Sequence, residues 1–343
     1  MTIRAGLIGF GLAGRYFHAP LLGPAGIRLH CVVTSRVQEL RDTYPDALAL
    51  ESAQSLIARG DVDLVVIASP NQFHFPQARA ALLAGKHVVV DKPMSITAAE
   101  AQTLAELARS QRRVLAAFQN RRWDSDFLTV RKLLDGNRLG QLASYRARWD
   151  RFRPQVADRW RERPDPGSGM LYDLGSHLID QALTLFGRPD WVQADVFVQR
   201  PDGAVDDGFE ILMAKGSLRI SLGVSSLAGP GDFRYCIHGS DASFVKYGLD
   251  PQEDQLRSGQ AALDAGFGVE AEDHWGVLIS STSSQREIVP SERGRWLRFY
   301  EAVKQSIVTG ADAPVTAHDA RDVIEIIEAA QISSREGRRI PLL

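Results

Sequence analysis

Short apolar runs alternate with amphipathic stretches of helical length through the first 120 residues of the chain. The apolar runs span residues 4–8, 29–34, 64–69, 87–91 and 114–118. Between them, residues 73–84 and 97–110 repeat apolar side chains at helical spacing. This alternation is typical of parallel strands joined by crossover helices, so it predicts an α/β domain with a doubly wound parallel sheet of the Rossmann type.

The pattern changes after about residue 120. Helices are predicted over residues 124–134 and 171–186, separated by a strand-like segment over 141–150 and an Arg- and Pro-rich loop over 151–167. Further strands are predicted over residues 192–199, 209–214, 218–224 and 235–238. Runs of strands with helices to one side predict an α+β domain on a large, mostly antiparallel open sheet.

The length and the change of pattern together indicate two domains. The chain has 343 residues, which suits two domains of ordinary size. We expect a dinucleotide-binding domain over residues 1–120 and a second domain over 121–343. A final helix over residues 317–334 could pack back on the first domain.

Composition and charge narrow the class of protein. Apolar residues make up 44% and charged residues 24%, and 40 basic residues stand against 42 acidic ones. This balance is typical of a globular protein and gives no reason to expect a nucleic-acid or membrane partner. Two distant cysteines, Cys31 and Cys236, and the lack of a signal-like apolar run predict a cytoplasmic protein.

A glycine-rich turn follows the first predicted strand. The turn reads Gly9-Phe10-Gly11-Leu12-Ala13-Gly14, which is G-x-G-x-x-G, and residues 15–22 after it have helical character. In a strand–turn–helix context these glycines allow a tight turn, close approach of a pyrophosphate and close packing of the helix. The pattern predicts a dinucleotide site, and the alternative is a glycine-rich turn without a ligand.

The end of the second strand indicates which dinucleotide binds. An acid at this place holds the ribose 2′-OH of NAD, whereas an arginine suits the 2′-phosphate of NADP. The chain has Thr34, Ser35 and Arg36 here, and its first carboxylate is Glu39 in the next helix. Hydroxyls and a guanidinium fit a phosphate monoester, so NADP is favoured. The alternative is that Ser35 caps the helix and Arg36 is solvated.

Two places carry candidate catalytic chemistry. Lys92 is one of only six lysines in the chain, and it follows a predicted strand at the carboxyl end of the sheet, where ligands bind. Asp173 and His177 are four residues apart and share one face if the segment is helical. An imidazole oriented by a carboxylate can take an alcohol proton, although a lone histidine is more often structural.

The other histidines show no equivalent pattern. His18, His74, His87 and His274 have no comparable pairing with a carboxylate in the sequence, and no H-E-x-x-H motif occurs. We therefore expect no metal site.

These motifs resemble those of the glucose–fructose oxidoreductase and inositol dehydrogenase (Gfo/Idh/MocA) family over nearly the whole chain. The matching motifs are the glycine turn, Ser69-Pro70-Asn71 with His74, Gly85-Lys86-His87 leading to Asp91-Lys92-Pro93, and Asp173-x-x-x-His177. The resemblance implies catalytic roles for Lys92, Asp173 and His177 and cofactor contacts at Ser69, Pro70, Asn71, His74, Asp91 and Lys92. Asp91 departs from the family, in which Glu is usual at this position.

Further stretches are similar to one subgroup of that family, which includes NADP-dependent scyllo-inositol dehydrogenases. They run from Gly9 to Pro20, from Gln119 to Asp124 and from Trp149 to Pro154. The resemblance implies hydride transfer between NADP and a cyclitol or sugar. Arg153 and Trp160 are candidates for substrate contact, because rings and bidentate donors suit a polyhydroxylated ring. A sugar-responsive transcriptional regulator of the same fold is the alternative function.

The second domain also predicts assembly. Several strands with few helices leave one face of the sheet in need of cover, and large exposed apolar patches are unusual in monomers. The family resemblance implies that such an open sheet often forms a subunit interface. We expect a homodimer or a homotetramer built from such dimers.

Overall fold

The computed structural model describes residues 2–229 and 232–342, which form two compact units. The first unit contains the chain up to Asn120 together with residues 252–267 and 295–321. The second contains residues 121–251, 268–294 and those from Asp322 onward. Two segments from the C-terminal half of the chain therefore belong to the first unit.

The first unit is built on six parallel strands in the order β3-β2-β1-β4-β5-β6. Their bounds are β1 Ile3–Ile8, β2 Ile27–Val33, β3 Leu48–Leu50, β4 Leu64–Ile67, β5 His87–Asp91 and β6 Leu115–Phe118. All residues of β4 are buried, as expected for a strand covered on both faces. The order reverses between β1 and β4, and ligands bind at such a switch point in open α/β sheets.

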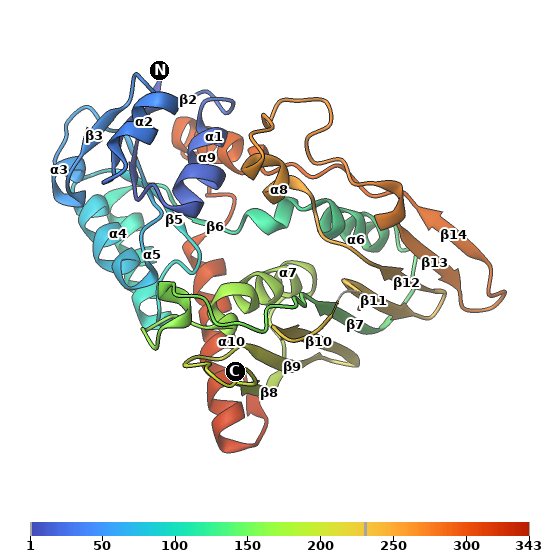
Figure 1. The fold of residues 1–343 in the computed structure, drawn as a ribbon. Coiled ribbons are helices and arrows are strands. Elements are labelled where there is room, and N and C mark those ends of the chain that lie inside the picture. Colours follow the sequence, from blue (N-terminus) through green and yellow to red (C-terminus); the bar gives the residue numbers. More distant parts are fainter. Residues whose placement is uncertain (1, 230–231, 343) are drawn as a thin grey trace. The chain divides into compact units, whose positions relative to one another are not determined.

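Helices join and cover these strands. They are the π-helix η1 Gly14–His18, α1 Ala19–Leu22, α2 Val37–Thr43, α3 Ala53–Ile57, the 3₁₀ turn η2 Asn71–Phe73, α4 His74–Leu83, α5 Ala98–Gln111, α8 Gln252–Arg257 and α9 Leu297–Thr309. Thr97 begins α5 with a capping box, in which its side chain accepts from Glu100 N–H and the Glu100 side chain accepts from Thr97 N–H. Figure 1 shows α4 and α5 side by side in this unit.

The second unit is built on nine strands in the order β14-β13-β12-β11-β7-β10-β9-β8-β15. Their bounds are β7 Leu142–Arg148, β8 Trp191–Phe197, β9 Gly208–Lys215, β10 Leu218–Ser225, β11 Tyr235–Gly239, β12 Ala242–Lys246, β13 Gly276–Ser280, β14 Arg286–Val289 and β15 Ile340–Pro341. Only the pair of β7 and β10 is parallel among these described strands. The mostly antiparallel sheet is confirmed.

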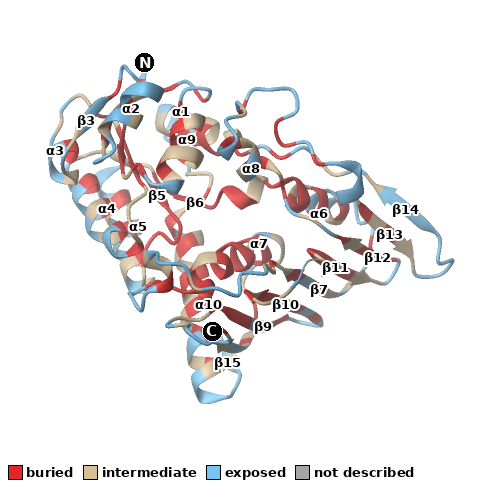
Figure 2. Ribbon diagram, in the orientation of Figure 1, coloured by how far each residue is buried: buried red, intermediate tan, exposed pale blue. Residues whose placement is uncertain are grey.

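The helices of the second unit include α6 and α7, which Figure 1 shows on the same side of its sheet. They are α6 Ser125–Asp135, the π-helix η5 Leu171–Gly175, α7 Ser176–Phe186 and most of α10 Ala317–Glu336, with short turns η3 Asn120–Trp123, η4 Trp160–Glu162 and η6 Glu272–His274. Alternate residues of the strands are buried beneath them, including Tyr145, Ile220 and Phe244. In Figure 2, much of α7 and parts of the strands of this sheet are coloured as buried.

Several elements of the structure were absent from the sequence prediction. β3 and β15 have three and two residues, too few to show an alternating pattern. β14 is exposed along its length, so it has no apolar face to detect. β12, β13, α8 and α9 were also missed, although β12 alternates buried and half-buried residues.

Candidate functional site

Each glycine of the first turn has a distinct steric role. Gly9 has φ +98°, and a Cβ there would lie 2.6 Å from the carbonyl oxygen of Ala68. A Cβ on Gly14 would lie 2.0 Å from the carbonyl oxygen of Gly9. A Cβ on Gly11 would meet no atom within 4 Å, so the turn leaves open space at its middle glycine. This arrangement fits the pyrophosphate of a dinucleotide.

Two arginines, one from η1 and one from the segment after β2, lie around one acid. Thr34 Oγ1 accepts a 2.9 Å hydrogen bond from Arg36 N–H, and the Arg36 guanidinium lies 3.7 Å from Glu39. Arg15, the second residue of η1, donates to the same carboxylate oxygen of Glu39. Arg36 is the N-cap residue of α2 and no side-chain cap is present, so the alternative that Ser35 caps the helix is wrong.

The loop after β4 is anchored by its own side chains. Ser69 Oγ donates to Gln77 of α4 at 2.8 Å, and Asn71 is 7% exposed. His74 begins α4 with no exposed surface, and its two ring nitrogens lie 2.7 Å from the carbonyl oxygens of Ser69 and Pro93. His74 therefore joins the loop after β4 to the loop after β5.

Asp91 ends β5 and Lys92 follows it, and both residues are 8% exposed. Asp91 Oδ1 accepts a 2.9 Å hydrogen bond from Lys92 N–H and lies 3.8 Å from His18 Nε2. Burial raises the pKa of Asp91, but the contact with His18 and the nearby charges of Lys92 and His74 hold that pKa below its ordinary value. The sequence pattern pairs His18 with no carboxylate, but the fold brings Asp91 to it.

In the second unit, Asp173 and His177 lie on consecutive helical segments. Asp173 belongs to the π-helix η5 and His177 to the first turn of α7. Single-turn π-segments are frequent at functional sites. Asp173 lies 3.7 Å from Arg161 Nε, and His177 is 5% exposed.

Asp206 holds the start of this π-helix. Its Oδ2 accepts a 2.7 Å hydrogen bond from Leu171 N–H, and its carbonyl oxygen accepts from Met170 N–H. Burial raises the pKa of Asp206 to about 6, with the neighbouring charge of Asp207 adding to the effect. Asp206 and Asp173 line the same small crevice.

The turn of α7 after His177 is held by buried polar bonds. Asp180 is 1% exposed and accepts two hydrogen bonds from Arg122, at 2.8 and 2.7 Å. Gln181 donates to the carbonyl oxygen of Arg121 at 2.9 Å, and its Oε1 accepts from Arg234 and Tyr235 at 3.0 and 2.9 Å. Such fully paired networks fix a helix in one register.

Trp149 lies beside His177 and is surrounded by cations. The two ring centroids are 6.0 Å apart, and Trp149 is 2% exposed. The guanidinium carbons of Arg121, Arg151 and Arg234 lie 4.7, 5.5 and 5.1 Å from the Trp149 ring centroid, within cation–π range. His177 therefore lies beside a buried aromatic ring that contacts three guanidinium groups.

The two candidates for substrate contact lie in the loop after β7. Arg153 is exposed, and its backbone N–H donates to the carbonyl oxygen of Ser226 at 2.7 Å. Trp160 is half-buried in η4, with the guanidinium of Arg161 at 5.0 Å from its ring centroid. Their contact with a substrate remains a prediction.

Sequence reasoning missed Arg15, His18 and Arg234. Arg15 directly follows the glycine turn, and that position was a usable signal. His18 and Arg234 pair with Asp91 and Asp126, which are remote in sequence, so no local pattern reveals them. Within residues 2–229 and 232–342, no three His, Cys, Asp or Glu side chains could share a metal ion. No helix in that part of the chain has the length and apolarity to cross a membrane.

Comparisons with known proteins cover both units. Residues 3–119 match the model of the oxidoreductase family's NAD-binding Rossmann fold, and residues 131–342 match the model of that family's C-terminal alpha/beta domain. Both are Gfo/Idh/MocA models.

Individual relatives are similar along nearly their whole length. The scyllo-inositol 2-dehydrogenase (NADP(+)) IolW of Bacillus subtilis is 40% identical over 99% of this chain and 96% of its own. The uncharacterized oxidoreductase YdgJ of Escherichia coli is 43% identical over 95% of both chains. The solved structure of the oxidoreductase yvaA from Bacillus subtilis has a TM-score of 0.96 at 40% identity, and the alignment covers 100% of this chain and 99% of that one.

Proposed function

The chain belongs to the Gfo/Idh/MocA family of oxidoreductases and is an NAD(P)-dependent dehydrogenase, and from this premise we propose that it transfers hydride between NADP and a secondary alcohol of a cyclitol or sugar. The first substrate to test is scyllo-inositol, because the relative of that name matches 99% of this chain. The alternative of a sugar-responsive regulator gains no support from the comparisons.

The pair of arginines around Glu39 is the observation that supports NADP as the cofactor. No acid stands at the end of β2, where NAD would need one for its ribose. Arg36 and Arg15 instead offer two guanidinium groups, each able to grip a phosphate with two N–H donors. The glycine turn, Ser69-Pro70-Asn71 and Asp91 would hold the rest of the cofactor.

The residues of the chain would manage the proton and the oxygen charge. When bound, NADP⁺ would accept the hydride at its nicotinamide ring. As the alcohol carbon gives up its hydride, His177 takes the hydroxyl proton and a ketone forms, so atoms and charge balance. Asp173 orients the imidazole and stabilises its cationic form. The Lys92 ammonium stabilises negative charge on the reacting oxygen.

The surroundings of His177 suit a polyhydroxylated ring. The Trp149 ring lies beside the imidazole, and the guanidinium groups of Arg121 and Arg234 lie within cation–π range of that ring. A cyclitol or sugar presents C–H faces that match aromatic rings and hydroxyls that match guanidinium donors.

The test is a direct assay of the purified protein. Inositols, aldoses and their keto forms are offered with NADP⁺, NAD⁺, NADPH or NADH, and the absorbance of reduced nicotinamide is followed. We expect turnover with at least one cyclitol or sugar and a higher kcat/KM with the NADP pair. A protein that binds NADPH but turns over no member of the panel would contradict the proposed function.

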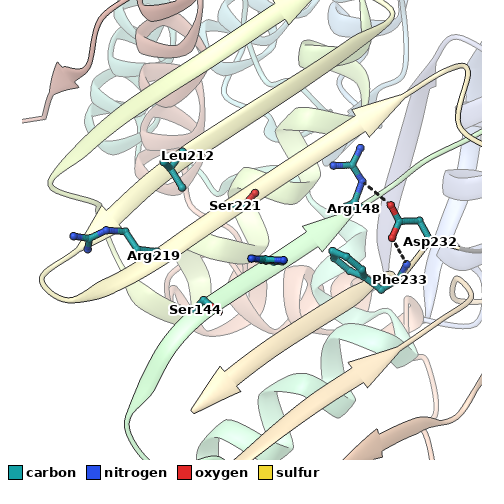
Figure 3. A pocket seen from close by; sticks show the side chains of 8 residues that line it. Ser144, Arg148, Leu212, Arg219, Ser221, Asp232 and Phe233 are labelled. Carbon is teal, nitrogen blue, oxygen red and sulfur yellow. Dashed lines mark hydrogen bonds and ion pairs between the residues drawn. The ribbon is translucent and has the colours of Figure 1, made fainter. Parts of the chain in front are cut away.

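We also propose that the open face of the nine-stranded sheet binds a second copy of the chain. A hollow of about 400 Å³ lies on this face, lined by Ser144, Arg146, Arg148, Leu212, Arg219, Ser221, Asp232 and Phe233. Figure 3 shows the side chains of these residues across the strands, with Arg148 beside Asp232. Arg146 and Arg219 lie on the neighbouring strands β7 and β10, and the acids Asp232 and Glu210 contact Arg148 of β7. Such mixed charge can pair with itself across a two-fold axis.

Assembly is tested by light scattering at micromolar concentration. We expect twice or four times the mass of the 37.8 kDa chain. The variant Leu212→Glu adds a charge on this face and should lower the mass, whereas Glu106→Gln on α5 should not. A wild-type mass of one chain would contradict the proposal.

A further inference from the structure

Three buried side chains form a line from α9 to the end of β5, all within the first unit. Tyr300 of α9 and His18 of η1 have no exposed surface, and Asp91 is 8% exposed. The Tyr300 hydroxyl lies 2.6 Å from His18 Nδ1, and His18 Nε2 lies 3.8 Å from Asp91 Oδ1. The same Asp91 oxygen accepts a hydrogen bond from Lys92 N–H, so the line ends beside the candidate catalytic lysine.

The surroundings of the His18 ring are otherwise aromatic. Its centroid is 4.2 Å from that of Phe118, whose ring packs against Phe299 at 4.9 Å. Within residues 2–229 and 232–342, the His18 ring has no hydrogen bond or ion pair besides those with Tyr300 and Asp91. Each ring nitrogen therefore faces one polar group, a phenol at Nδ1 and a carboxyl at Nε2.

The states of these two groups are set by the charges around them. Burial raises the pKa of Asp91, but the His18 contact and the charge of Lys92 hold that pKa below its ordinary value, so the carboxylate is ionised and only accepts hydrogen bonds. Burial and the charge of Asp91 raise the pKa of Tyr300 well above its ordinary value. The Tyr300 hydroxyl therefore keeps its hydrogen and needs an acceptor.

Only one form of the His18 ring satisfies both groups. With its proton on Nδ1 alone, the ring would turn the Nε2 lone pair toward the Asp91 carboxylate. With protons on both nitrogens, it would leave the buried Tyr300 hydroxyl without an acceptor, since the described part of the chain gives that hydroxyl no other hydrogen bond. With its proton on Nε2 alone, Nδ1 accepts from Tyr300 and Nε2–H faces Asp91.

We propose that Tyr300 is a positioning residue that holds the neutral His18 ring with its proton on Nε2, so that an N–H faces the Asp91 carboxylate beside Lys92. Asp91 Oδ1 then lies between two N–H groups, one from the His18 ring and one from the Lys92 backbone. Tyr300 acts on the site only through these neighbours. Its effect on turnover rests on the proposed function, whereas the protonation of the ring does not.

His87 provides an internal reference at the opposite end of β5. Its Nδ1 accepts a 3.0 Å hydrogen bond from Val114 N–H, which requires a lone pair on that nitrogen. Burial and the nearby Arg113 lower the pKa of His87 to about 4, so its ring is neutral at pH 7.5. His87 therefore shows the spectrum of a neutral ring whose Nδ1 accepts a hydrogen bond.

The first test is NMR of ¹⁵N-histidine-labelled protein at pH 7.5, with signals assigned from His18→Gln and His87→Gln. His18 should show an unprotonated Nδ1 and a protonated Nε2, and His87 should show an unprotonated Nδ1 in the same spectrum. A proton on His18 Nδ1 at that pH, in either a neutral or a cationic ring, would overturn the proposal.

The second test identifies the donor to His18. Tyr300→Phe keeps the aromatic ring and removes only the hydroxyl, so the Nδ1 signal of His18 should move downfield, as expected for a lone pair that has lost its donor. The signals of His87 should not move. Tyr247→Phe is the matched control, because Tyr247 is 50% exposed in the second unit. An unchanged His18 spectrum in folded Tyr300→Phe would refute the role of Tyr300.

The third test applies once turnover is established. Tyr300→Phe should lower kcat at least fivefold and leave KM for the alcohol and the Kd for NADPH within about threefold, because the charge of Lys92 acts mainly in the transition state. Tyr247→Phe should keep normal kcat. Normal kcat in Tyr300→Phe, or a rise in KM alone, would contradict the positioning role. If no substrate is turned over, the proposed function fails, and the two NMR tests still decide the state of the ring.

Discussion

Two regions of the molecule are built by different means: the cofactor half, which is the glycine turn with residues 34–39 in the first unit, and the substrate half, which is the surroundings of His177 in the second unit. In the first unit the glycine turn leaves open space at Gly11. The two arginines proposed for the ribose phosphate are partly open to solvent: Arg36 retains 54% of its side-chain surface and Arg15 retains 34%. In the second unit the Trp149 ring lies beside His177 and contacts the Arg234 guanidinium, and Arg234 and its partner Asp126 are almost fully enclosed. The free-energy cost of binding and releasing a ligand is small for exposed groups, whereas buried ion pairs hold the surrounding structure rigid.

Because of this difference, we expect mutations in the two halves to have different effects. Changes in the cofactor half should alter affinity for one dinucleotide and leave folding intact. Changes in the substrate half should alter rate or stability and leave dinucleotide affinity intact.

The largest expected effect is that of His177→Ala. Loss of a positioned general base typically costs about 10² to 10⁴ in rate, so kcat should fall within that range. The Kd for NADPH should stay unchanged, because His177 lies on α7 of the second unit and the glycine turn lies in the first. Steady-state kinetics and fluorescence titration check both values.

His274 supplies the matched control for this variant. It is an exposed histidine of η6 in the same unit, and His274→Ala should keep normal kcat. Near-normal turnover in His177→Ala with intact cofactor binding would make Lys92 or another group the base.

The next effect concerns stability. Arg234 donates to Asp126 at 2.8 Å, and both side chains are at most 2% exposed. Arg234→Met removes the partner of a buried carboxylate, so it should lower the free energy of unfolding by about 3–5 kcal/mol. Urea denaturation measures this loss.

A second substitution separates charge from packing. The double variant Arg234→Met with Asp126→Leu removes both charges and should recover much of the loss, since an apolar pair of similar volume is often neutral. A single variant as stable as the wild type would show that the buried pair contributes nothing to folding.

The same contrast explains how much the sequence could predict. The glycine turn, Thr34-Ser35-Arg36 and Lys92 are contiguous motifs at strand ends, and the structure puts each motif at the carboxyl edge of the parallel sheet. The alternation of strands and helices predicted that sheet because β4 and β5 are apolar runs with clear turns between them.

The residues that the sequence did not reveal make contacts with residues remote in sequence. His18 and Asp91 are 73 positions apart, and Asp126 and Arg234 are 108 apart, so only the fold brings them together. The π-helical form of residues 171–175 also has no signal in the apolar pattern. Periodicity reports which face is buried, but it does not report which buried polar groups pair.

A smaller effect is expected in the cofactor half. Arg36→Ala should weaken NADPH by a charge-assisted hydrogen bond, about 1.5 to 3 kcal/mol, and barely change NADH. Arg41→Ala on the same helix is the matched control, because Arg41 is also exposed but lies one turn further along α2. Equal losses for NADPH and NADH would mean that Arg36 does not read the 2′-phosphate.

The smallest expected effect is that of Glu39→Gln, and it tests the exposed nature of the cofactor half most directly. The Glu39 carboxylate contacts Arg15 and lies 3.7 Å from Arg36, so it competes with a 2′-phosphate for both guanidinium groups. An exposed ion pair is worth roughly 0.2–1 kcal/mol, so removing the competing charge should tighten NADPH binding only about 1.4- to 5-fold.

The gain from Glu39→Gln should shrink as salt is raised, because interactions between exposed charges are screened. NADH, which has no 2′-phosphate, should bind as before, and Glu106→Gln on α5 should change neither affinity. If Glu39→Gln instead weakens NADPH, the carboxylate must hold Arg15 and Arg36 in position rather than compete for them. The cofactor half would then depend on a preformed ion-pair network, as the substrate half does, and the contrast between the two halves would fail.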